Sequence, residues 1–183
     1  MARPTTMWRR RAAGPWRRLD AISRAMFPAI MLVVGLFLLG LPLDLPGQAA
    51  LRPVFTMGCV FFWSLYRPAA LPAPVVVGIG LLLDLLGLTP FGLWAVLLLL
   101  MQGLTIALRR RLVPAHFLLT WAAFSALSML ATGLEWVVQS WFVPAALPWQ
   151  PAGLQIVLAL ALYPALAAFL IRVHRGPAAV ELV

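Results

Sequence analysis

Residues 79–108 read IGLLLDLLGLTPFGLWAVLLLLMQGLTIAL and contain one charged side chain, that of Asp84. Apolar residues run on without the apolar–polar alternation of a β-barrel strand, as in the leucine runs 81–83 and 97–100. A segment in lipid has to satisfy its backbone hydrogen bonds internally, and an α-helix does so. The stretch therefore predicts two membrane helices joined by a turn around Gly87 and Pro90.

The rest of the chain has the same character. Of its 183 residues, 63% are hydrophobic and 10% are charged, against roughly 25% charged residues in a soluble domain. A soluble fold of this size could not bury so much apolar surface, because surface area grows too fast relative to volume. The predicted fold is therefore an all-α, polytopic integral membrane protein.

Turns rich in proline and glycine divide the apolar sequence into six predicted transmembrane helices. They cover residues 25–41, 53–66, 73–86, 91–108, 115–142 and 152–173. Residues 25–173 would form the transmembrane domain, with an arginine-rich cytoplasmic tail at 1–24 and a second cytoplasmic tail at 174–183. The run 53–66 is short for a bilayer, which needs roughly 20 apolar residues, so we expect it to lie behind its neighbours or in a thinned patch.

The charge pattern predicts the orientation. All fourteen basic residues are arginines, and the net charge is +9. With both termini in the cytoplasm, six helices place every arginine except Arg52 on the cytoplasmic side, as the positive-inside rule requires of an inner-membrane protein. Topology thus accounts for the positive charge, and we expect no nucleic-acid partner.

Residues that could carry out catalysis are scarce. His116 and His174 have no candidate partner nearby in sequence, and the single cysteine, Cys59, lies in an apolar run. The sequence has no nucleophile elbow, no zinc-binding helix motif and no phosphate-binding loop. We therefore expect no enzymatic activity, no catalytic residue, no metal ion and no cofactor.

Two acidic residues, Asp84 and Glu135, fall within predicted helices. An ionisable side chain in a bilayer is costly and should face the protein interior or water. Both lie toward the predicted periplasmic side, as does Arg52, so we predict that Arg52 contacts Asp84, Glu135 or Asp44. In the alternative interpretation each acid is a wetted group at the interface with no role.

Glycines surround Asp84 in the sequence, at positions 78, 80, 87 and 92. Small residues let membrane helices approach closely, so the helices over 73–86 and 91–108 are predicted to form a tight hairpin. The alternative is that these are ordinary membrane glycines, which are common.

The motifs of residues 51–95 follow one another in a characteristic order. Leu51-Arg52-Pro53 opens a short helix that ends near Trp63-Ser64-Leu65-Tyr66, and a turn at Pro72 follows. Then come Gly80, Asp84-Leu85 and, eight residues after Asp84, Gly92. In order and spacing this stretch resembles the MreD family, the rod shape-determining membrane proteins of bacteria. It departs from the family pattern in the turn over residues 87–91, where relatives often have glycine one place later.

The resemblance implies a non-enzymatic scaffold of the cell-wall elongation complex, needed for rod shape and peptidoglycan synthesis. Such a protein would dock the single transmembrane helix of MreC, and through it connect to MreB, RodA and a penicillin-binding transpeptidase. The docking surface is expected near Asp84 and Gly80. The candidate partner-binding or packing residues are Arg52, Pro53, Gly80, Asp84, Gly92 and Glu135.

Two other functions fit the composition. A substrate-binding subunit of a vitamin transporter would have an outward-facing pocket, which Glu135, Trp136 and Gln139 could line. A membrane-embedded lipid enzyme would need paired acids or a histidine facing one cavity. Asp84 and Glu135 together in a water-filled cleft, without Arg52, would favour this function.

Overall fold

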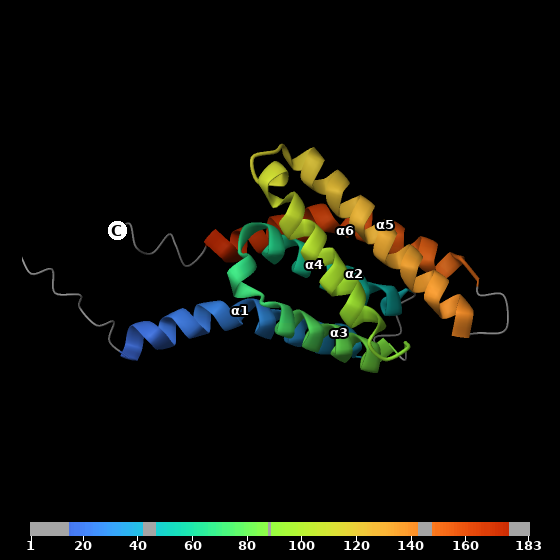
Figure 1. The fold of residues 1–183 in the computed structure, drawn as a ribbon, viewed down its shortest axis with the longest axis horizontal. Helices are drawn as coiled ribbons and strands as arrows, with labels where there is room; N and C mark the ends of the chain where they lie inside the picture. The colour runs from blue at the N-terminus through green and yellow to red at the C-terminus, as the bar shows by residue number, and fades with distance from the viewer. Residues whose placement is uncertain (1–14, 42–46, 88, 143–147, 176–183) are drawn as a thin grey trace, which may run out of the picture.

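The computed structural model describes residues 15–41, 47–87, 89–142 and 148–175, with side chains from residue 26 to residue 172 of these ranges. Within them the chain is all-helical, as predicted, and Figure 1 shows the arrangement. The elements are α1 (Pro15–Gly40), α2 (Gln48–Tyr66), the short 3-10 helix η1 (Pro68–Ala70), α3 (Ala73–Gly87), α4 (Leu93–Leu112), α5 (Phe117–Phe142) and α6 (Gln150–Arg175).

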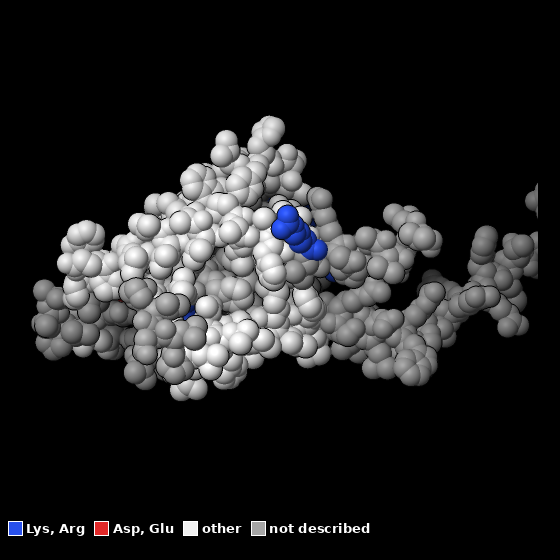
Figure 2. Space-filling model, turned by 180° about the vertical axis from the view of Figure 1, so that it is seen from behind, with Lys and Arg blue, Asp and Glu red and all other residues white. Residues whose placement is uncertain are grey.

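Four of these helices are long and apolar enough to cross a membrane, namely α2, α4, α5 and the Gln150–Arg172 part of α6. Two shorter apolar helical segments, Met26–Gly40 and Ala73–Gly87, accompany them. Figure 2 shows a face whose described surface is almost entirely uncharged. The chain is thus an all-α membrane protein, and the number of six spans stays a prediction.

Successive helices run in opposite directions (Figure 1). The start of α1, the α2–α3 turn, the α4–α5 turn and the end of α6 lie at one end of the bundle, on the left of Figure 1. Among the basic residues with described side chains, Arg67, Arg109–Arg111 and Arg172 belong to this end, and Arg52 belongs to the other. We call these the arginine-rich end and the Arg52 end.

Two helices begin earlier than the sequence suggested. Helix α1 begins at Pro15, so residues 15–24, expected in the tail, are helical. Helix α2 begins at Gln48 rather than at Pro53, because Gly47 turns the chain with a φ of 82° and starts the helix one turn sooner. Pro53 then lies in the second turn of α2, where it lacks the N–H of an ordinary helical residue.

Helix α4 ends later than expected. It continues past Leu108 through all three arginines to Leu112. Positive side chains in a last turn interact favourably with the negative end of the helix macrodipole, so the arginines extend this helix instead of stopping it.

Helix α2 forms the centre of the bundle. Nearly every residue from Pro53 to Leu65 is buried, because α2 packs against α1, α4 and α6. A stacked pair, Phe124 of α5 and Tyr163 of α6, has ring centroids 4.1 Å apart, and Phe61 of α2 lies edge-on to both. The apolar side chains of this short helix therefore pack inside the protein, as expected for a helix that is hydrophobic on all sides.

Candidate functional site

The Asp84 carboxylate caps helix α4 from the neighbouring helix α3. Its Oδ2 accepts a hydrogen bond from the backbone N–H of Gly92 at 2.9 Å. Its Oδ1 accepts from the N–H of Trp94 at 3.0 Å and from the Thr89 hydroxyl at 2.8 Å. The first N–H groups of a helix have no partner within the helix, and the positive end of the macrodipole favours an anion there. Asp84, only 2% exposed, provides that anion.

Gly92 explains why the cap comes from another helix. It is the N-cap residue of α4, with a φ of 93°, a conformation that L side chains rarely adopt. A glycine has no side-chain oxygen to accept from its own helix. The eight residues from Asp84 to Gly92 therefore span the α3–α4 turn, so that the carboxylate of α3 meets the first N–H groups of α4.

Gly80 is the point of closest approach between α3 and α4. A Cβ built on Gly80 would lie 2.5 Å from the Ala95 nitrogen and 2.9 Å from the Trp94 carbonyl carbon, both in the backbone. Backbone cannot rotate aside, so only glycine fits. A Cβ at Gly78 or Gly92 would meet nothing within 4 Å, so of these three glycines only Gly80 is required for the close contact between the two helices.

The Arg52 guanidinium connects three helices. Its Nη1 donates to the Leu86 carbonyl of α3 at 2.8 Å, and its Nε and Nη2 donate to the Leu39 and Gly40 carbonyls of α1 at 3.2 and 3.4 Å. The last carbonyls of a helix lack partners within it and attract a cation. Arg52, in the first turns of α2, thus binds two helix C-termini at once.

Of the three acids predicted to contact Arg52, the described residues exclude two. Among the described residues, its hydrogen bonds go to backbone carbonyls and not to Asp84 or Glu135. The third candidate, Asp44, lies outside the described residues. Arg52 still reaches α3 two residues beyond Asp84, and we call Arg52, Gly80, Asp84 and Gly92 the interlock. Pro53 is buried beside it in α2.

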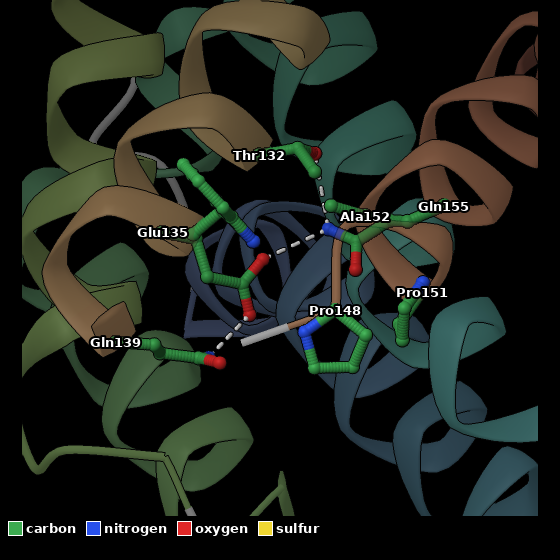
Figure 3. A pocket seen from close by; sticks show the side chains of 8 residues that line it. Thr132, Glu135, Gln139, Pro148, Pro151, Ala152 and Gln155 are labelled. Carbon is green, nitrogen blue, oxygen red and sulfur yellow. Dashed lines mark hydrogen bonds between the residues drawn. The ribbon is translucent and has the colours of Figure 1, made fainter. Parts of the chain in front are cut away.

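Glu135 belongs to a separate polar cluster between α5 and α6 (Figure 3). Its Oε1 accepts from Gln139 Nε2 and its Oε2 from Gln155 Nε2, each at 3.1 Å. Gln155 Nε2 also donates to the Thr132 hydroxyl at 3.1 Å. Thr132, Glu135 and Gln139 share one face of α5, since residues three and four apart are neighbours on a helix.

These side chains line a cleft of about 120 Å³ together with Trp136 and residues at the start of α6. Gln139 and Gln155 each use an N–H group on Glu135, and the side-chain oxygens of Glu135, Gln139 and Gln155 supply hydrogen-bond acceptors in the cleft. The cleft is therefore suited to a small donor or cation. It contains the three residues that the transporter hypothesis named, but its volume is well below the roughly 300–1,000 Å³ of a typical ligand pocket.

Trp94 stands between the two acids. Its backbone N–H binds Asp84, and its indole interacts with the Glu135 carboxylate. Asp84, however, does not line the cleft and has both oxygens engaged. Among the described residues, Asp84 and Glu135 therefore do not face one cleft.

Several contacts between helices were not predicted. Buried Gln102 donates to the Leu71 carbonyl at 2.7 Å, Arg109 Nε donates to the Leu65 carbonyl at 2.7 Å, and Gln155 completes the Glu135 cluster. Gln102 and Gln155 share one signal, an amide side chain inside an apolar helix, which in lipid has to find a partner. Within the described part of the chain, no group of three or more His, Cys, Asp and Glu residues could hold a metal ion.

No protein-family model, no curated protein and no solved structure matches the chain. The family resemblance of residues 51–95 therefore stays a prediction.

Proposed function

We propose that the chain is a non-enzymatic scaffold of the bacterial cell-wall elongation complex, of the MreD type, which supports rod shape and peptidoglycan synthesis by docking MreC in the inner membrane. One observation carries the proposal. The residues on which the resemblance rests form a single structural unit. Arg52 donates a hydrogen bond to α3, Gly80 lets α3 and α4 pack closely, and Asp84 accepts a hydrogen bond from Gly92 at the start of α4.

The chemistry of the interlock suits positioning. Both oxygens of Asp84 and all three guanidinium nitrogens of Arg52 are engaged within the protein. Groups committed in this way hold helices at fixed distances and angles. A scaffold that presents a surface to other membrane helices needs such rigidity.

The proposed topology has six spans with both termini in the cytoplasm. The arginine-rich end of the bundle would face the cytoplasm, because positively charged segments are retained there. The Arg52 end, with the interlock and the Glu135 cluster, would face the periplasm.

The MreC helix is not proposed to touch Asp84 or Gly80 directly. Both are buried, and α4 already covers them. Instead, a groove of about 310 Å³ runs between α1, α2 and α6. Its lining is apolar and consists of Leu39, Leu51, Val54, Phe55, Leu162, Ala165, Leu166 and Phe169.

This docking groove is connected to the interlock through one residue. Leu39 lines the groove, and its carbonyl accepts hydrogen bonds from Arg52 and from Gln48. Arg52 therefore fixes the wall of the groove while it binds α3. We propose that the transmembrane helix of MreC packs here. The interlock then affects docking indirectly, because Arg52 holds α1 in place and α1 forms one wall of the groove.

Ala165→Trp is expected to abolish most co-purification of MreC with the protein. Ala165 is exposed in the groove, and an indole would fill the space that a helix side chain needs. The matched control is Ala126→Trp, an exposed alanine of α5 outside the groove, which should leave co-purification unchanged. Equal recovery of MreC with both variants would contradict docking in this groove.

A second candidate function has one observation in its favour. The Glu135 cleft has the lining that a binding subunit of a transporter would need, and a cleft of about 120 Å³ could hold an ammonium or a guanidinium group but not a vitamin. The scaffold is therefore preferred. A small molecule found by mass spectrometry on the purified protein, and lost in Glu135→Gln, would favour the transporter.

A further inference from the structure

A groove at the arginine-rich end is not used by the proposed docking of MreC. It has a volume of about 750 Å³ and lies between η1 and the last turns of α4. Arg109 and Arg110 line it together with Pro68, Ile106, Ala107 and Val113. Its volume falls within the range of roughly 300–1,000 Å³ that ligand pockets have.

The two arginines can bind an anion. Arg109 uses its Nε to donate to the Leu65 carbonyl at 2.7 Å, which fixes its side chain and leaves the two Nη groups for a ligand. Arg110 is exposed, and no described residue forms a hydrogen bond or ion pair with its guanidinium. Guanidinium groups bind phosphate oxygens in pairs of parallel hydrogen bonds.

No described carboxylate competes for these arginines. Among the side chains that the structure describes, the acids are Asp84 and Glu135, and both lie toward the Arg52 end. The C-terminus of α4 carries only about half a negative charge, which the full charges of the arginines outweigh.

The position of the groove selects a lipid rather than a soluble anion. Helix α4 has 20 residues, which at 1.5 Å per residue matches the hydrocarbon thickness of a bilayer, about 30 Å. Its last turn therefore lies at the level of the headgroups. Ile106 lies one turn below Arg110 on the same side of α4, so an apolar wall continues from the arginines toward the membrane interior.

We propose that this groove binds an anionic phospholipid, with Arg109 and Arg110 donating to the phosphate oxygens. Ile106, Ala107 and Val113 pack against the glycerol and the first carbons of an acyl chain. The headgroup then occupies the space between η1 and α4 and ties the α2–α3 connection to the end of α4.

The test is native mass spectrometry of the full chain in detergent, with phosphatidylglycerol or phosphatidylcholine added. The wild type is expected to retain phosphatidylglycerol in preference to phosphatidylcholine. Arg110→Gln should weaken retention of phosphatidylglycerol roughly fivefold, the effect of losing about one hydrogen bond to the phosphate. Arg111→Gln removes the same charge from a residue that does not line the groove, so it should weaken retention less than Arg110→Gln does.

A second variant separates a groove from a mere patch of charge. Ala107→Trp keeps every arginine but fills the apolar part, and it should lower retention of phosphatidylglycerol as Arg110→Gln does. Equal effects of Arg110→Gln and Arg111→Gln, or unchanged retention in Ala107→Trp, would overturn the proposal. So would displacement of the lipid by glycerol 3-phosphate, because the arginines alone would then define a site for a soluble phosphate.

Discussion

Gly80→Ala is expected to destabilise the protein by about 2 to 3 kcal/mol, because overpacking at a point of backbone contact forces α3 and α4 apart. The added methyl group would lie 2.5 Å from the Ala95 nitrogen, and no side-chain rotation can relieve that contact. The effect is measured by heating the protein in detergent and recording the fraction that stays monodisperse at each temperature.

The matched control lies two residues away in the same helix. Gly78→Ala places a methyl group in open space, on an exposed position of α3. Alanine is favoured over glycine in a helix by up to about 1 kcal/mol, so this variant should be as stable as the wild type or more stable. If both alanines shifted the unfolding temperature alike, the α3–α4 contact at Gly80 would be refuted.

Asp84→Ala is expected to cost about 3 kcal/mol, because it leaves the buried N–H of Trp94 and the partly buried N–H of Gly92 without an acceptor. The variant should still insert into the membrane, since no apolar segment changes. It should be less stable to heat and should co-purify less MreC, because α4 and α3 lose their fixed geometry.

Two further substitutions test whether the loss of stability in Asp84→Ala comes from the loss of the helix cap. Asp84→Asn keeps the shape and one acceptor oxygen, so its stability should fall between that of the wild type and that of Asp84→Ala. Thr89→Val removes a single hydroxyl donor to Asp84 and should cost about 1 kcal/mol. A fully stable Asp84→Ala would show that the carboxylate does not cap α4.

The sequence was sufficient to predict the elements and the hairpin. Helices in lipid are long apolar runs separated by proline and glycine, and this pattern is visible without any contact information. Gly80 could be predicted as a packing residue because glycine is the residue that allows membrane helices to approach. Which of several glycines makes the contact depends on the rotation of α3 about its axis, and a single sequence does not specify that rotation.

The partner of Arg52 could not be predicted from charge alone. The sequence shows acids that could pair with it, but not where helix C-termini converge, and the unpaired carbonyls of Leu39, Gly40 and Leu86 bind the guanidinium. For the same reason Asp84 was expected at a partner surface, whereas it is buried under α4. Gln155 was missed because an amide in an apolar helix reveals its role only when the facing helix is known.

Depletion of the protein in a rod-shaped bacterium in which it has been made to replace MreD tests the proposed scaffold function most directly. The account predicts that cells become round as the protein is lost, and that re-expression of the wild type, but not of Gly80→Ala, restores rods. Cells that keep their shape and instead lose the uptake of a vitamin would contradict it.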